Sequence, residues 1–207
     1  MKSSTARSAL AVILAAALWG CANPVEYTIV EHYGALAPAS VAVLPVEWGH
    51  AVRERNPAAA VLFREVTIQK LRSMSYAAAA ADETDAAIAA YGRSRFDELD
   101  PAGKCRLLGT EAFMRVVIDE WDKSMLAIYG SLTLRTSFEL YSKDGGLLWS
   151  ASYETKEWDL TFDRETMEIA ILGTFEPRVQ RIVDMAFTTL LERKEHKPER
   201  TYFEWLR

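Results

Sequence analysis

The feature that most constrains the fold is a long alternation of apolar and polar residues over residues 126–141. One parity carries apolar side chains and the other carries mostly polar ones, a period typical of a β-strand with one buried and one solvated face. The alternation resumes at residues 147–153, after a glycine-containing turn at residues 143–146. Residues 112–121 alternate more loosely. We therefore expect an antiparallel three-stranded meander. Its buried face in the long strand is formed by Leu126, Ile128, Leu132, Leu134, Phe138 and Leu140.

The first half of the chain predicts a βαβ unit. Residues 40–46 are apolar and rich in valine, as in a strand that is buried on both faces, and Pro45 ends that strand because it has no N–H to donate. The segments expected after it are a helix over residues 58–75, a weak strand over 75–81, and helices over 82–91 and 101–108.

Two helices are expected near the C-terminus, a short one over residues 161–171 and a long amphipathic one from Thr174 to about Leu191. The apolar stripe of the long helix should cover the long strand. We expect the core contact to involve Leu132, Leu134, Phe138, Val183, Phe187 and Leu190. The predicted fold is α/β (α+β): a layered mixed β-sheet with a βαβ unit, an antiparallel three-stranded meander and a long C-terminal amphipathic helix. It forms a single domain over residues 40–194.

The N-terminus has the pattern of an export signal. Lys2 and Arg7 precede an apolar run over residues 9–19 that is too short to span a bilayer. The run ends in Leu18-Trp-Gly-Cys21, which resembles the lipobox of bacterial lipoproteins. The resemblance implies that residues 1–20 are a signal peptide, that cleavage falls between Gly20 and Cys21, and that Cys21 carries lipid. An ordinary secretory signal, with Cys21 in a disulfide, is the alternative.

The lipobox resemblance also implies a location. Ala22 stands where an Asp would favour retention in the inner membrane, so the resemblance implies the outer membrane, facing the periplasm. Residues 21–39 are predicted to be the lipidated cysteine and a tether, with a reach of roughly 60 Å when extended. The formal net charge of −5 argues against a nucleic-acid partner.

A search for catalytic chemistry finds no signature. His32, His50 and His196 lack metal-site spacing, and neither a P-loop nor a nucleophile-elbow motif occurs. We therefore expect no enzyme activity, no metal and no cofactor. An acidic stretch leaves open an envelope enzyme acting on glycan or peptidoglycan. Its members are Glu154, Glu157, Asp159 and Asp163.

Cys105 is interpreted as a small buried hydrophobe, with a reactive thiol as the alternative. No His or Asp accompanies it in a known catalytic pattern. If Cys21 carries lipid, Cys105 has no cysteine partner, because these are the two cysteines of the sequence.

The order of elements carries a further resemblance. With the segments Ser40-Val-Ala-Val-Leu-Pro45 and Asp144-Gly-Gly-Leu-Leu-Trp149, and the helix-to-strand passage over residues 71–81, the chain resembles a family of uncharacterised bacterial lipoproteins. Their domain is similar to the TolB N-terminal domain and to the core of CsgG-like lipoproteins. The resemblance implies an envelope-assembly or export accessory that binds a protein partner, for which a CsgG-like lipoprotein is the candidate.

Residues 195–207 are predicted to form a charged and then aromatic tail. A solvated tail has no reason to carry so much apolar surface, so it either folds back onto the domain or anchors a protein partner. The anchoring candidates are Tyr202, Phe203, Trp205 and Leu206. Carriage of a lipid or polysaccharide in a hydrophobic groove is a third possible function, beside the scaffold and the enzyme.

Overall fold

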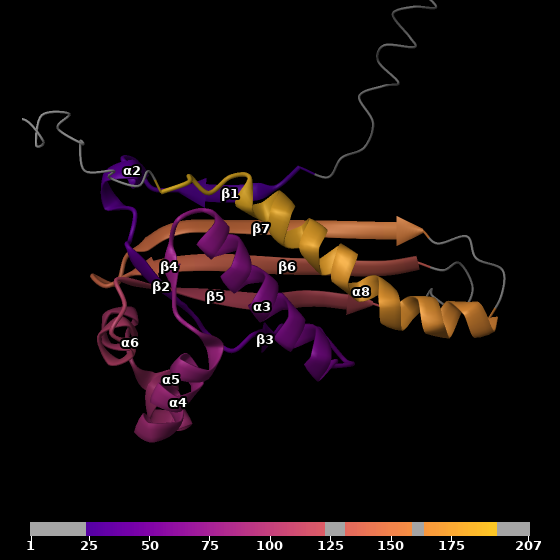
Figure 1. The fold of residues 1–207 in the computed structure, drawn as a ribbon, viewed down its shortest axis with the longest axis horizontal. Helices are drawn as coiled ribbons and strands as arrows, with labels where there is room; N and C mark the ends of the chain where they lie inside the picture. Colours follow the sequence, from indigo (N-terminus) through magenta and orange to yellow (C-terminus); the bar gives the residue numbers. More distant parts are fainter. Residues whose placement is uncertain (1–23, 123–130, 159–163, 194–207) are drawn as a thin grey trace, which may run out of the picture.

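The structure, a computed structural model, describes residues 24–122, 131–158 and 164–193. Across these residues one mixed sheet has the strand order β1-β7-β6-β5-β2-β4, and β3 pairs with β5 beside that path. The predicted fold class is confirmed, with several helices packed around a mixed sheet (Figure 1). The strands are β1 (Glu26–Ile29), β2 (Ser40–Val43), β3 (Glu47–Trp48), β4 (Ala77–Ala78), β5 (Ala112–Asp122), β6 (Ser131–Ser142) and β7 (Leu147–Trp158).

The meander predicted from the alternation is formed by β5, β6 and β7, which pair antiparallel in sequence order. Leu134, Phe138 and Leu140 of β6 are fully buried on one face, while the residues between them on the other parity are only partly covered or exposed. The turn between β6 and β7 has Gly145 at φ 90°, a conformation that side chains with a Cβ rarely adopt. The sequence alternation therefore identified the buried face of these described residues correctly.

The βαβ unit runs from β2 through helix α3 (Pro57–Ser73) to β4, which lies parallel to β2. On its other side β2 pairs in parallel with β5. Asn56 caps α3 by accepting hydrogen bonds from the N–H groups of Ala58 and Ala59, and Pro57 occupies the first helical position. The expected strand over residues 75–81 is reduced to Ala77–Ala78, because its alanines supply little side-chain packing.

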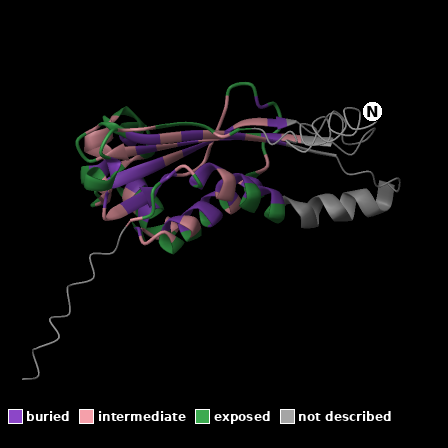
Figure 2. Cartoon of the chain, turned by 90° about the horizontal axis from the view of Figure 1, so that it is seen from above, coloured by how far each residue is buried: buried purple, intermediate pink, exposed green. Residues whose placement is uncertain are grey.

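Helices α3 and α8 (Arg164–Phe187) lie side by side on one face of the sheet (Figures 1 and 2). An aromatic group sits between that face and α8, in which the Trp149 and Phe187 ring centroids lie 5.3 Å apart and those of Phe138 and Phe187 lie 5.6 Å apart. The predicted core contact is confirmed for its described side chains, which share one buried cluster. They are Leu134, Phe138, Val183, Phe187 and Leu190; the side chain of Leu132 lies outside the described ones.

A smaller layer covers part of the second face. It consists of α4 (Ala81–Tyr91), α5 (Arg93–Glu98) and α6 (Pro101–Leu108), which we call the α4–α6 lobe. Its core is separate from the first and contains Ala42, Leu44, Ile88, Phe96, Cys105 and Phe113. The lobe covers the second face at the β2 side of the sheet only, so alternate residues of β2 are buried in two different cores.

The tether predicted over residues 21–39 is contradicted in its described part. Residues Glu26–Ile29 form β1, which pairs antiparallel with β7, and the short helix α2 (Tyr33–Leu36) follows. Tyr33 is 2% exposed, and its hydroxyl lies 2.9 Å from that of Tyr76. The folded domain therefore begins well before residue 40. Sequence analysis missed β1 because a strand of four residues is too short to show an alternation, and because its partner, β7, lies far away in the sequence.

The expectation of two C-terminal helices is also wrong. A single helix, α8, runs through Gly173 and Thr174 and contains Pro177 in its interior. A proline inside a helix removes one backbone hydrogen bond, but packing of the apolar stripe holds the described part of α8 against α3 and the sheet. None of the helices in the described ranges is both long enough and apolar enough to cross a membrane.

Candidate functional site: an open polar face of the sheet

The face of the sheet opposite α3 and α8 is left uncovered by described helices beyond the α4–α6 lobe. The lobe reaches as far as Phe113 and Tyr141, whose rings stack with centroids 5.2 Å apart. Past that pair the second face is polar. We call it the open face, and its described polar side chains are Glu26, Thr28, Glu47, Arg115, Asp119, Glu120, Arg135, Ser137, Glu139, Ser150, Ser152 and Glu154.

Arg115 of β5 connects two neighbouring strands of the open face. Its guanidinium donates to Glu47 of β3 at 2.8 Å and to Glu139 of β6 at 3.1 Å. These hydrogen bonds hold the pKa of Arg115 above its usual value, with that to Glu47 contributing most. The Tyr141 hydroxyl also donates to Glu139 at 3.1 Å. Burial, followed by the charge of Glu139, raises the pKa of Tyr141.

A second ion pair lies further along the same strands. Arg135 of β6 donates two hydrogen bonds to Glu154 of β7, and these bonds raise the pKa of the guanidinium. Glu120 lies 4.0 Å away on the other side of Arg135. The register of β5 and β6 shifts between Ile118 and Glu120, and the extra residue, Asp119, accepts a hydrogen bond from Ser137.

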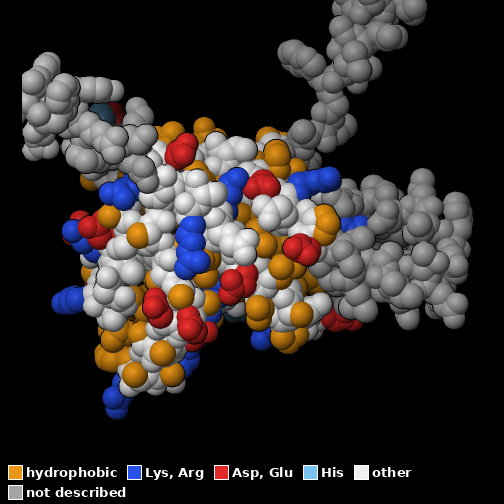
Figure 3. Space-filling view, in the orientation of Figure 1, with side chains coloured by type: hydrophobic (Ala, Val, Ile, Leu, Met, Phe, Trp, Pro, Cys, Tyr) orange, Lys and Arg blue, Asp and Glu red, His pale blue; other side chains and the backbone are white. Residues whose placement is uncertain are grey.

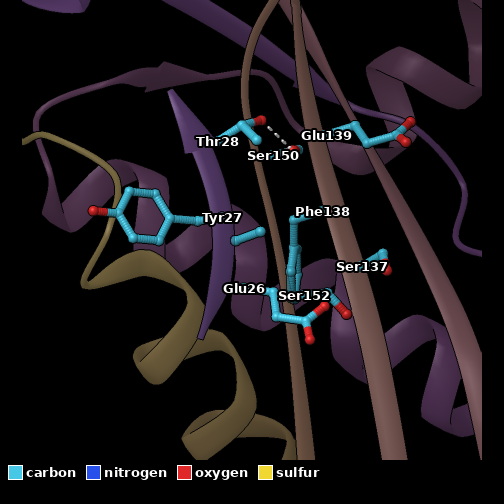
Figure 4. A pocket seen from close by; sticks show the side chains of 9 residues that line it. Glu26, Tyr27, Thr28, Ser137, Phe138, Glu139, Ser150 and Ser152 are labelled. Carbon is cyan, nitrogen blue, oxygen red and sulfur yellow. Dashed lines mark hydrogen bonds between the residues drawn. The ribbon is translucent and has the colours of Figure 1, made fainter. Parts of the chain in front are cut away.

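Between these charges lies a shallow depression of about 300 Å³ over β1, β7 and β6 (Figure 4). Its polar lining is mostly small hydroxyl side chains, with Thr28 and Ser150 joined by a hydrogen bond of 2.7 Å. Glu26 and Glu139 stand at its margins. The other lining residues are Tyr27, Ser137, Phe138, Ala151 and Ser152. Small side chains at these register positions leave the sheet surface accessible to a partner or ligand.

The helix-covered face has a different surface. Figure 3 looks onto it and shows acidic and basic side chains interspersed with scattered apolar atoms. Lys70 of α3 donates to Asp184 of α8 at 2.7 Å, and Gln180 donates to the same carboxylate at 3.0 Å. Partial burial raises the pKa of Asp184, but these hydrogen bonds outweigh it, and the pKa lies below its usual value. This pair joins two helices and presents no free reactive group.

The sequence-predicted site residues fall in several places. Gly20, Cys21 and the tail residues Tyr202, Phe203, Trp205 and Leu206 lie outside the described residues. Of the acidic stretch, Glu154 is in the ion pair with Arg135, whereas the side chains of Glu157, Asp159 and Asp163 lie outside the described ones. Among the described residues, no group of three or more His, Cys, Asp or Glu side chains is placed to hold a metal ion.

Cys105 is 1% exposed in the core of the α4–α6 lobe. Burial raises the pKa of its thiol to about 11, which keeps it protonated at neutral pH. The interpretation of Cys105 as a small buried hydrophobe is confirmed, since a reactive thiol needs a lowered pKa and access to solvent.

Arg64 is a key residue that sequence analysis missed. It lies on α3, and its side chain is 9% exposed. Its guanidinium donates to the carbonyl of Val43 at 3.0 Å, to that of Ala81 at 3.2 Å and to Asp85 at 2.8 Å. These three contacts fix the end of β2 and the start of α4 relative to α3. The available signal was an arginine beside Phe63 in a helix that was expected to be largely buried.

Comparisons with known proteins bear on the fold alone. No family model and no curated protein matches the sequence. Among solved structures, lipoprotein GNA1162 from Neisseria meningitidis is similar with a TM-score of 0.51 and 15% identity, over 68% of this chain and 98% of that one. The PelC dodecamer from Paraburkholderia phytofirmans has a TM-score of 0.48 and 15% sequence identity, over 82% of this chain and 98% of that one. The hypothetical protein CT253 from Chlamydia trachomatis has a TM-score of 0.41 and 13% sequence identity, over 71% of this chain and 98% of that one. The chain shares its fold with a bacterial lipoprotein.

Proposed function

We propose that the protein is a lipid-anchored accessory of the cell envelope that works by binding a protein partner and catalyses no reaction. Cys21 carries the lipid, and the domain faces the periplasm from the outer membrane. The partner belongs to an envelope-assembly or export machinery, and a CsgG-like lipoprotein is the leading candidate. The supporting sequence features are the segment Leu18-Trp-Gly-Cys21, which resembles a lipobox, and an order of elements that resembles that of TolB-like domains.

The observation that carries the proposal is the open face. It spans β1, β7, β6 and β5, and its arginines are engaged with carboxylates on neighbouring strands. The carboxylates of Glu47 and Glu139 are paired with Arg115, and that of Glu154 is paired with Arg135. A rigid polar surface with satisfied charges suits recognition by a partner better than chemistry.

The fold comparison gives additional support, because the similar GNA1162 protein is described as a lipoprotein. The tail residues Tyr202, Phe203, Trp205 and Leu206 remain a second candidate contact with the partner. The two candidate contacts share no residues, so each can be altered by mutation without changing the other.

The anchoring part of the proposal is tested by replacing Cys21→Ala. We expect the variant to lose metabolic labelling with palmitate and to leave the membrane fraction, because two or more acyl chains are needed for stable attachment. Mass spectrometry of the native protein should find the mature N-terminus at Cys21, carrying lipid. An unmodified Cys21, or cleavage elsewhere, would contradict the anchor.

The binding part is tested by crosslinking in cells followed by affinity purification. Ser152→Arg places a bulky cation in the depression of the open face and should reduce recovery of the partner severalfold. Ser94→Arg adds the same charge at an exposed position of α5 and should have no effect. Deletion of residues 200–207 tests the tail in parallel. Equal recovery with all three variants and the native protein would exclude both contacts.

A further inference from the structure

The start of the fold determines how far the domain lies from its proposed anchor. Val25 is partly buried against the main core, and β1 begins at Glu26. Between Cys21 and Pro24, the first described residue, there are three Cα-to-Cα steps, which span at most about 11 Å. The tether of 18 residues that the sequence suggested would have allowed a reach several times longer.

The strand next to the proposed anchor is firmly joined to the sheet. Four residues of β1 pair with Trp149–Ser152 of β7, and the N–H of Val30 donates to the carbonyl of Leu148 at 3.0 Å. The hydrogen bond between the Thr28 and Ser150 hydroxyls adds a side-chain contact. The short connection therefore ends on a rigid element and cannot be lengthened by release of β1 without breaking the sheet edge.

The position of β1 in the sheet sets the orientation of the whole domain. β1 is one edge strand and β4 is the other, with four strands between them in the sheet order. At about 4.8 Å for each strand spacing, the two edges lie about 24 Å apart. The α4–α6 lobe lies on the β2 side, away from β1 (Figure 1).

An exposed aromatic residue lies on the same edge. Tyr27 of β1 is 55% exposed, although its register partner on β7, Ala151, is buried. A tyrosine combines an apolar ring with a polar hydroxyl, and this combination favours the headgroup region of a bilayer. Both the short connection and the exposed ring thus place the lipid surface at the β1 edge.

We infer that the sheet stands edge-on at the membrane, with β1 at the lipid headgroups and the α4–α6 lobe farthest from them. This inference rests on the proposed lipidation of Cys21. It names the bilayer surface as the contact of the β1 edge. The open face then lies roughly perpendicular to the membrane plane and is accessible from the side, to a partner that is held at the same membrane.

The test uses the full-length lipidated protein, reconstituted into vesicles of phosphatidylethanolamine and phosphatidylglycerol that contain a headgroup spin-labelled lipid. Single cysteines for a fluorescent probe are introduced as Thr28→Cys on β1 or Ser94→Cys on α5, in a Cys105→Ala background. Lipid on Cys21 is confirmed by mass spectrometry of each sample. We expect the probe at position 28 to be quenched severalfold more strongly than the probe at position 94.

A matched control inserts a flexible segment of about 20 Gly and Ser residues between Ala22 and Asn23, with a root-mean-square reach of about 25 Å. Lipidation should persist, and the difference in quenching between the two positions should largely disappear. Equal quenching at positions 28 and 94 in the lipidated protein without the insertion would overturn the orientation while leaving the anchor intact. Absence of lipid on Cys21 would overturn the proposed anchor itself.

Discussion

The two faces of the sheet are built from the same strands but are stabilised in different ways. On the face toward α3 and α8, Phe138, Trp149 and Phe187 form a closely packed aromatic group with almost no exposure. On the open face, the same strands carry ion pairs that remain partly exposed, such as Arg115 with Glu139. The covered face derives its stability from burial of apolar area, while the open face contributes modest electrostatic energy.

The difference teaches which face is available for function. A substitution on the covered face is expected to change the free energy of unfolding, whereas one on the open face leaves it nearly unchanged and alters recognition instead. Each of the following substitutions tests whether that division holds, from the largest expected effect to the smallest.

Truncation of the aromatic group should have the largest effect. Phe138→Ala or Phe187→Ala removes a ring from a fully packed site and should lower the free energy of unfolding by about 3–5 kcal/mol. Urea unfolding followed by circular dichroism measures it. The control on the opposite face of the same sheet is Ser152→Ala, which should change stability by less than about 0.5 kcal/mol. A similar loss of unfolding free energy in all three variants would contradict the proposed difference between the two faces of the sheet.

Arg64 and Arg115 allow the energetic cost of losing a buried arginine to be compared with that of losing a partly exposed one. Arg64→Ala leaves the buried carbonyl of Val43 and the partly buried carbonyl of Ala81 without the guanidinium donor and should cost about 2–3 kcal/mol. Arg115→Ala, at a site where the side chain is 39% exposed, should cost less than about 1 kcal/mol. Thermal melts of the two variants should differ clearly. An equal fall in melting temperature would mean that the open-face network is structural.

Cys105 tests the core under the α4–α6 lobe. Cys105→Ser introduces a hydroxyl into an apolar site and should lower the free energy of unfolding by about 1–2 kcal/mol, more than Cys105→Ala. Because burial raises the thiol pKa to about 11, alkylation at pH 7 should proceed only after addition of denaturant. Rapid alkylation of the native protein would contradict the burial.

The bridge between α3 and α8 should give the smallest effect, with a defined pH dependence. The pKa of Asp184 is lowered in the folded protein, so its contribution to stability is present above the ordinary aspartate pKa and is lost as the pH falls through the lowered value. Asp184→Asn should cost about 0.5 kcal/mol at pH 7, since the pair is partly exposed. The difference from the native protein should shrink as the pH falls below the ordinary aspartate pKa. A constant difference across this range would exclude the ionic contribution.

The sequence predicted the meander and its buried face because each of those features is local. The alternation around Leu134 and Phe138 records the burial of every second residue, and it needs no knowledge of the partner strand. The sequence predicts two helices where the structure has the single helix α8, because the helix propensity at Gly173 and Thr174 is low. Helix stability in a folded protein depends more on tertiary packing than on this local propensity. The same alternation predicted the solvated face of β6 that carries Arg135, Ser137 and Glu139, but the extension of that face onto β1 and β3 depends on strand pairings that are distant in the sequence.

The pairing of β1 with β7 bears on the order in which the strands join the sheet during folding. Thr28 and Ser150, which face each other across this edge, are 122 residues apart in the sequence. The first strand of the described sheet therefore cannot pair until its last strand, β7, is available. Closure of so long a loop is slow compared with formation of the β6–β7 hairpin. The backbone N–H and C=O groups of Glu26–Ile29 thus lack their sheet partners until β7 has formed, and β1 is the strand expected to join the sheet last.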